Sequence, residues 1–230
     1  MSLSELCERA ILEKKGKNYK INISWVNKIK NFGEKVEKLY SSKNVIKDFE
    51  KDDIINLSFS RFVDFGKFII NVFHGEFPNP EKNACVCFLD HVWGPMGLDE
   101  EDVKQLEKVY HRNKHFGFFK QDSPLDQYFA DGMQVLGKVC FLGVELPVQG
   151  DILIEGDYIC QVFYSPEFKK KFDTLYENIP KVGQGDFISF FKLYQEPHTI
   201  QAVITKNPRL ANYLRKWVTD FEEKEGKKKI

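Results

Sequence analysis

Two short apolar runs, KFIINVFH (67–74) and ACVCFLDHVW (84–93), constrain the fold of this chain more than any other feature. Both are continuous and rich in β-branched or aromatic residues, the pattern of strands that are buried on both faces. The linking stretch GEFPNPEKN has turn chemistry, so the two runs can pair as a hairpin with a long loop. The segment 67–93 is therefore predicted to form an inner part of a β-sheet.

Helices are predicted where apolar residues recur at three- and four-residue spacing. The first covers residues 3–12 behind a serine cap, and the second begins at Ser24. A third starts at Asp99, an N-cap with Asp102 three residues later. Carboxylates in a first helical turn offset the helix dipole, so we interpret the acidic run 99–102 as a helix start rather than a metal site.

The last third of the chain contains two segments with the same plan, 159–179 and 200–221. In each, an apolar strand ends at a capping residue (Ser165 or Asn207), a proline takes the first helical position, and an amphipathic helix follows. This ending is loosely similar to the ligand-sensing halves of bacterial one-component regulators. The likeness brings no site residue with it.

Further strands are predicted at 135–146 and 151–164. Together the elements predict an α/β (α+β) protein with a mixed, mainly antiparallel sheet flanked by helices and an N-terminal helical segment. The expected divisions are the helical segment 1–50, the mixed α/β body 51–221 and a charged tail 222–230.

The composition excludes several classes of protein. With 230 residues, 42% hydrophobic and 30% charged, the chain is long enough for a proper core and is not of disordered composition. It has no apolar run long enough to span a membrane and no secretion signal. Its five cysteines are an odd number and suit reduced, buried thiols. We therefore expect a cytoplasmic protein without a membrane partner.

The helix that begins at Ser24 carries an apolar seam at alternating spacings of four and three residues, the heptad pattern of helices that pack together. The seam is too short for a free-standing coiled coil, but it suits packing on the body or on a second copy in a homodimer. The predicted interaction residues are Trp25, Ile29, Phe32 and Val36, followed by Leu39.

The net charge is zero, from 34 basic and 34 acidic residues, and no overall basicity points to nucleic acid. Residues 1–50 do carry 11 Lys/Arg against 7 Asp/Glu. Lysines of the second helix could contact phosphates, but the spacing of a helix-turn-helix is absent. We therefore expect a small molecule or a protein as the partner, and not nucleic acid. The lysines concerned are Lys28, Lys30, Lys35 and Lys38.

The stretch from His74 to His91 is similar in part to the zinc deaminase signature H-x-E…P-C-x-x-C. It supplies His74, Glu76, prolines, Cys85 and Cys87, but a single residue separates the thiols and no helix start follows them. In a strand the two thiols share a face and could reach one ion. A core strand accounts for the pattern more simply. No cofactor is predicted, and whether the chain binds a metal stays open.

Other motifs fail at their spacing. His111 and His115 are four apart, but two basic residues lie between them and no H-E-x-x-H occurs, so we interpret them as the cationic end of a helix. The glycines near residue 140 form neither G-x-G-x-x-G nor a P-loop. The chain has no G-x-S-x-G elbow.

Asp90 and His91 form the favoured candidate site, because sites are often built where a buried strand ends. The pair can supply a metal ligand and its orienting carboxylate, or a base and its partner, and Trp93 would form a wall. The predicted ligand-binding residues are Asp90, His91, Trp93, His74 and Glu76. The plainer alternative is a capped strand end whose histidine bonds to backbone.

The sequence predicts a non-enzymatic, cytoplasmic ligand-binding or regulatory protein with an aromatic-rich core. No group of residues has both the types and the spacing that catalysis needs, although enzymatic activity stays an open question. One alternative is a metal-dependent hydrolase or transferase that uses Asp90 and His91 with His74 and Glu76. A second is a nucleic-acid-binding regulator that acts through the basic N-terminal helix.

Overall fold

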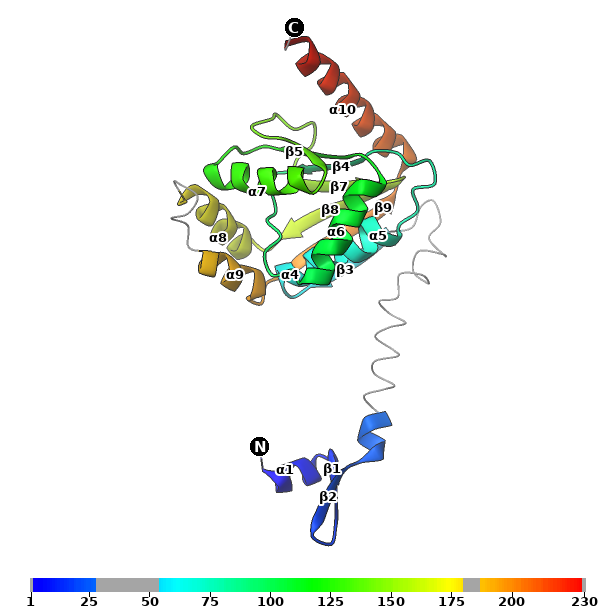
Figure 1. Ribbon diagram of the computed structural model, residues 1–230, viewed down its shortest axis with the longest axis vertical. Helices are drawn as coiled ribbons and strands as arrows, with labels where there is room; N and C mark the ends of the chain where they lie inside the picture. The colour runs from blue at the N-terminus through cyan, green and yellow to red at the C-terminus, as the bar shows by residue number, and fades with distance from the viewer. Residues whose placement is uncertain (1, 28–53, 180–186, 229–230) are drawn as a thin grey trace. The chain divides into compact units, whose positions relative to one another are not determined.

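The structure is a computed structural model that describes residues 2–27, 54–179 and 187–228. It divides into two compact units, Met1–Phe49 and Glu50–Ile230, and each is described by itself (Figure 1). Among the described residues, no helix is both long enough and apolar enough to cross a membrane.

The first unit contains one helix and a hairpin. Helix α1 (Leu3–Glu8) begins at a capping box formed by Ser2 and Glu5, which confirms the expected serine cap. Strands β1 (Leu12–Lys15) and β2 (Asn18–Ile21) then pair antiparallel. The segment that we expected to be helical therefore includes a two-stranded sheet.

The predicted interaction seam lies largely outside the part of the chain that the structure describes. Residues 23–27 are helical and Trp25 is half-buried. The residues that fall outside are Ile29, Phe32, Val36 and Leu39, with the lysines at 28, 30, 35 and 38. The expected association through this seam stays a prediction.

The second unit is built on a seven-stranded sheet of order β3-β9-β8-β7-β4-β5-β6. Neighbours from β3 to β4 run antiparallel, whereas β4, β5 and β6 run parallel. The mixed, mainly antiparallel sheet is thus confirmed. In sheet order the strands are Ile54–Phe59, Ile200–Lys206, Tyr158–Tyr164, Asp151–Glu155, Cys85–Leu89, His115–Phe119 and Lys138–Phe141.

Alternate residues of the central strands point to opposite faces of the sheet, and each face has its own helices. Helix α10 (Pro208–Lys228), which continues through most of the expected charged tail, packs on the face formed by Val86, Phe88 and their neighbours. The other helices of this unit pack on the opposite face, to which Cys85 and Cys87 point. They are α4 (Phe62–Phe68), η1 (Ile69–Phe73), α5 (His74–Glu76), α6 (Glu100–Arg112), α7 (Pro124–Val135), α8 (Pro166–Glu177) and α9 (Phe187–Gln195).

The prediction of a strand at 67–74 is wrong, because the chain there is helical through α4, the π-helical turn η1 and α5. A run of eight apolar residues does not by itself distinguish a strand from a buried helix. The helical period starts upstream of the run, with buried residues three and four apart at Phe62, Phe65, Ile69 and Phe73. The second run does enter the sheet as the buried strand β4 (Cys85–Leu89).

The segment 151–164 forms two strands rather than one. β7 and β8 are joined by a tight turn at Gly156, whose φ is +53°. His115 was expected at the cationic end of a helix. It is instead the first residue of strand β5. Helix α6 begins at the predicted capping box of Asp99 and Asp102, and both carboxylates bind Lys67.

Candidate functional site

The sequence-predicted ligand residues do not converge on one pocket. His74 lies beside the first residue of β4, whereas Asp90 and His91 follow its last residue, so the length of the strand separates them. Glu76 is exposed. Trp93 lies in the loop after β4, with its ring in the aromatic core.

His91 is buried in a network that joins the end of β4 to α7 and α8. Its Nδ1 lies 3.1 Å from Oδ2 of Asp126, and its Nε2 lies 3.5 Å from Oδ1 of Asp173. Asp126 also accepts from the backbone N–H of Val92 at 2.8 Å and from the hydroxyl of Ser123 at 2.6 Å. Both ring nitrogens therefore have protein partners, and the arrangement is that of a structural histidine.

Asp151 lies at the same end of the sheet. It accepts from the hydroxyl of Tyr164 at 2.6 Å and from the backbone N–H of Asp90 at 2.7 Å. Burial outweighs these bonds and raises its pKa from 3.8 to about 6. Between these two values the folded protein binds more protons than the unfolded chain, so the free energy of unfolding falls as pH rises.

We expect Asp151→Asn to remove this fall. Relative to the wild type, the variant should gain about 2 kcal/mol of stability between pH 4 and pH 7. Urea unfolding followed by far-ultraviolet circular dichroism at several pH values measures the difference. Asp131→Asn, at an exposed position of α7, is the matched control and should follow the wild type. A gain for Asp151→Asn that does not change with pH would contradict the assignment.

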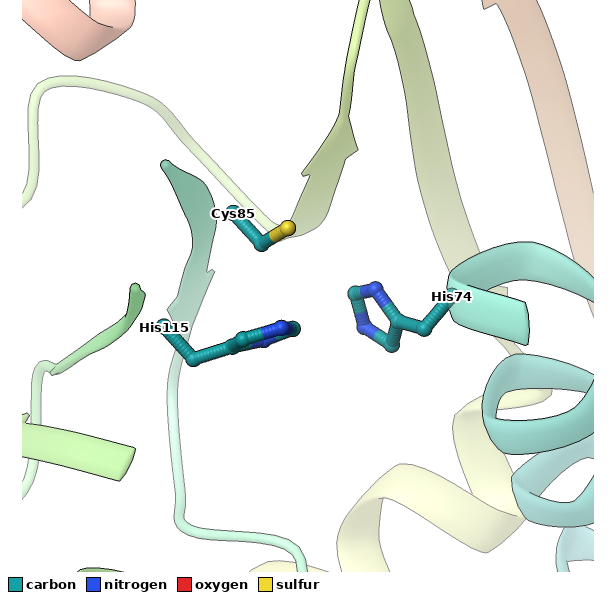
Figure 2. Close-up of side chains that lie close together, drawn as sticks. All are labelled: His74, Cys85 and His115. Carbon is teal, nitrogen blue, oxygen red and sulfur yellow. The ribbon is translucent and has the colours of Figure 1, made fainter. Parts of the chain in front are cut away.

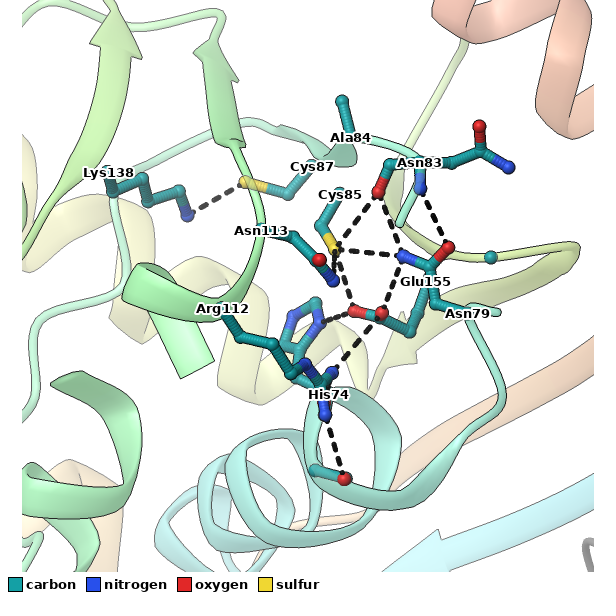
Figure 3. Close-up of polar contacts among 12 residues, drawn as sticks. His74, Asn79, Asn83, Ala84, Cys85, Cys87, Arg112, Asn113, Lys138 and Glu155 are labelled. Atoms are coloured by element: carbon teal, nitrogen blue, oxygen red, sulfur yellow. Dashed lines mark hydrogen bonds and ion pairs between the residues drawn. The ribbon is translucent and has the colours of Figure 1, made fainter. Parts of the chain in front are cut away.

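The main polar site is the Glu155 cluster, which we define as His74, Asn79, Cys85, Arg112 and Glu155 (Figure 3). Oε2 of the fully buried Glu155 accepts from Nδ1 of His74 at 2.8 Å and from the thiol of Cys85 at 2.9 Å. Oε1 accepts from the Asn79 amide at 3.0 Å and lies 3.5 Å from Nη2 of Arg112. Arg112 also donates to the backbone carbonyl of His74.

The register of the sheet explains why these residues meet. β4 and β7 run antiparallel with Cys87 opposite Leu153, which places Cys85 and Glu155 side by side on the same face. On the other side of Cys85, its parallel partner on β5 is His115. Helix α5 brings a second histidine over them, as Figure 2 shows.

Burial and charge set the protonation states of these groups. Burial, together with the charge of Glu155, raises the pKa of the Cys85 thiol, so that Cys85 keeps its proton and is a poor nucleophile. Burial opposes the charge of Glu155, but hydrogen bonds from His74, Cys85 and Asn79 lower its pKa below the usual value. Burial and nearby positive groups lower the pKa of His115 well below 6.5. The site is thus an anion beside a thiol and a neutral imidazole.

A metal could be held by His74, Cys85 and His115, which each place a ligand atom within 4.8 Å of the other two (Figure 2). All three side chains are buried. His74 and Cys85 were already candidate metal ligands in the sequence. His115 was instead expected, with His111, at the end of a helix. Only its pairing with Cys85 in the sheet brings His115 to this position.

Cys87, the other thiol of the predicted zinc pattern, contacts a lysine instead. Lys138 on β6 reaches across β5, and its Nζ lies 3.0 Å from Sγ of Cys87. Gly117 permits this crossing, because a Cβ there would lie 2.9 Å from Cε of Lys138. The ammonium group also lies 5.7 Å from the ring centroid of Tyr110 and 5.5 Å from that of Phe119. No carboxylate of the described residues forms an ion pair with Lys138.

A cavity of about 80 Å³ lies between this face of the sheet and the helices α4, η1 and α6. Lys138, His74 and Trp93 line it, and the indole Nε1 of Trp93 is buried with no hydrogen-bond partner in the described chain. Its apolar walls include Phe62, Ile69, Leu89, Val92, Leu106 and Met133. The predicted residues that do not line it are Asp90, His91 and Glu76.

Comparison with known proteins gives a distant likeness of fold. No protein-family model and no curated protein matches the chain. Among solved structures it is similar to TrmBL2, an archaeal chromatin protein described as showing a novel mode of DNA binding. The match covers 96% of this chain and 79% of that chain, at a TM-score of 0.36 and 12% sequence identity.

This comparison corrects one expectation about partners. The sequence led us to expect a small molecule or a protein and not nucleic acid, but the solved chain that is similar to this one binds DNA. The exclusion of nucleic acid therefore does not stand. At a TM-score of 0.36 the likeness carries no argument for what this chain itself binds.

Proposed function

We propose that this protein is a non-enzymatic binding protein for a small, mainly apolar molecule that carries a carboxylate group. The ligand occupies the cavity between the sheet and helices α4, η1 and α6. The observation that supports this proposal is the ammonium group of Lys138, whose neighbours are a thiol and two aromatic rings but no carboxylate among the described residues. Lys138 is half-buried, and a partly desolvated charge without a counterion costs free energy that an anionic ligand removes.

A second donor supports the same class of ligand. The indole N–H of Trp93 is buried at the cavity without a partner in the described chain, whereas buried donors in folded proteins normally have one. A carboxylate has two acceptor oxygens, enough for both Trp93 and Lys138. Neutral apolar ligands would leave the indole N–H of Trp93 unpaired and the ammonium group of Lys138 without a counterion.

The size of the cavity limits the ligand. Its volume of about 80 Å³ is roughly half that of an engineered cavity of about 150 Å³ that holds benzene. The ligand is therefore smaller than benzene, and we propose a short-chain acid such as propionate or butyrate. The apolar walls suit the short hydrocarbon chain of such an acid, and Lys138 suits its charged end.

The other functions expected from the sequence receive less support. A hydrolase or transferase site that combines Asp90 and His91 with His74 and Glu76 would have to join groups at opposite ends of β4. Nucleic-acid contact through the N-terminal helix stays a prediction, since its lysines fall outside the described residues. The cytoplasm remains the proposed compartment, because all five cysteines are free thiols.

Isothermal titration calorimetry with propionate and butyrate tests the proposal, and propionamide and butyramide serve as neutral probes of the same shape. We expect the wild type to bind the acids at least about tenfold more tightly than the amides, because a hydrogen bond to a charged group contributes about 1.5 to 3 kcal/mol. Lys138→Met, which keeps the length of the side chain, should lose this preference.

The matched control is Lys108→Met, at an exposed position of α6, which should bind like the wild type. Three results would each contradict the proposal: acids that do not bind the wild type at millimolar concentration, amides that bind as tightly as acids, or unchanged affinity in Lys138→Met.

A further inference from the structure

We infer that His74, Cys85 and His115 bind a zinc ion, at a site separate from Lys138 and independent of the carboxylate proposed to bind there. The three side chains come from α5, β4 and β5, and their ligand atoms lie within 4.8 Å of one another. Their exposed fractions are 7%, 1% and 3%. Three protein ligands leave the fourth position of a tetrahedral ion to water. Because the ligands come from separate elements, the ion would also hold α5 on the sheet.

The geometry requires only small movements. Tetrahedral zinc has nitrogen ligands at about 2.0 Å and sulfur at about 2.3 Å, which puts the two nitrogens and the one sulfur about 3.3 to 3.5 Å apart. Atoms within 4.8 Å of each other reach this arrangement when they close by about 1 Å. Rotation of the three side chains provides such a shift, while the backbones of Cys85 and His115 stay paired in the sheet.

His115 provides the strongest sign of a missing partner. Its Nε2 is buried without a hydrogen-bond partner in the described chain, and the residue is only 3% exposed. A metal ion at this position would be the missing partner of Nε2. Buried polar atoms are normally satisfied, and Figure 2 shows the ring directed toward His74 and Cys85.

Glu155 prepares His74 in the same way. It accepts from Nδ1 of His74 at 2.8 Å, so that the ring proton lies on Nδ1 and the lone pair on Nε2. Metal-binding histidines usually donate their other N–H to a carboxylate or a backbone carbonyl, which fixes the tautomer and the ring. His74 has such a partner in Glu155.

The surroundings of Cys85 suit a thiolate bound to a cation. The side-chain amides of Asn79 and Asn113 lie 3.8 Å and 3.9 Å from its Sγ. Zinc displaces the thiol proton, so that Cys85–SH and Zn²⁺ give a Zn–S bond and one H⁺ released to solvent. The ion then keeps one positive charge, which the carboxylate of Glu155 offsets. Imidazole and thiolate ligands favour zinc over magnesium or calcium, which take oxygen ligands.

Cobalt(II) is the probe that tests this site, because a cobalt–thiolate bond gives a sulfur-to-metal charge-transfer band in the near ultraviolet. Full-length, tag-free protein is stripped with EDTA and titrated with Co²⁺. We expect one equivalent to bind with this band and one equivalent of Zn²⁺ to displace it. Cys85→Ser should lose the band, and His115→Gln should bind cobalt at least about tenfold more weakly.

Cys87→Ser is the matched control, because Cys87 lies two residues along the same face and contacts Lys138 instead. It should keep the band, as should Lys138→Met, which separates failure of this site from failure of the ligand proposal. Zinc should also raise the Tm of the wild type and of Cys87→Ser, but not of Cys85→Ser. A wild type without the band, a band that persists in Cys85→Ser, or a band lost in Cys87→Ser would overturn the inference.

Discussion

Replacing Glu155 with alanine is expected to lower the free energy of unfolding by about 3 to 5 kcal/mol. The carboxylate is fully buried and accepts from His74, Cys85 and Asn79, with Arg112 at 3.5 Å. Alanine removes the acceptor but leaves the four donors in place, and each unpaired buried donor costs free energy. The lost side-chain volume adds a cavity term.

Glu155→Gln is the control for this change, because it keeps the shape of the side chain and one acceptor oxygen. We expect it to lose about 1 to 3 kcal/mol, since the amide N–H₂ would face other donors. Urea unfolding in EDTA, followed by tryptophan fluorescence and circular dichroism, measures both variants without a contribution from metal. A loss below about 1 kcal/mol in the alanine variant would show that the network does not stabilise the fold.

Gly156→Ala is expected to destabilise the protein by at least about 3 kcal/mol or to prevent folding. Gly156 turns the chain between β7 and β8 at a φ of +53°, and a Cβ there would lie 2.2 Å from the carbonyl oxygen of Pro78. The crowding atom belongs to the backbone, so no side-chain rotation relieves it. The segment that carries Asn79 would have to move away from Glu155.

Gly150→Ala separates this crowding from backbone strain. Gly150 also has a positive φ, +78°, but a Cβ there meets nothing within 4 Å. Only the left-handed conformation is then strained, at a cost of about 1 kcal/mol. Thermal and urea unfolding of both variants give the comparison. Similar losses at the two positions would contradict the close approach of Pro78 to Gly156.

The predictable part of the fold is the part with local signals. The buried strand Cys85–Leu89 is a continuous apolar run, and α6, α8 and α10 each begin at a side-chain cap. Helix α7 carries the same kind of signal, a capping box of Ser123 and Asp126 with Pro124 at the first position. The helix Pro124–Val135 could therefore have been predicted from the sequence, but it was not.

The errors arise where one local pattern fits two structures. The run 67–74 is apolar throughout, and only the spacing of buried residues upstream of it identifies a helix. The strand His115–Phe119 follows a helix directly and is five residues long, too short for its alternation to stand out. In both places the deciding contacts lie outside the segment, in the sheet and the helices that pack on it.

Half of the candidate site is recognisable from the sequence. His74 and Cys85 belong to a stretch with the residue types of a metal site, but their partners Glu155 and His115 do not. Glu155 precedes a glycine in a strand and resembles an ordinary turn residue. In the sequence, Lys138 does not differ from the other lysines. It reaches the cavity only because Gly117 leaves room for its side chain to cross β5. These partners are joined by strand register, which sequence patterns do not specify at this range.

The spans across which Glu155 makes its contacts have a consequence for folding kinetics. Its hydrogen bonds join residues 81, 76 and 70 positions apart in the chain. Loops of that length must close before any of these bonds can form, so local structure precedes them. We therefore expect these bonds to form late in folding. Weakening them should then shorten the lifetime of the native state and leave the folding rate nearly unchanged.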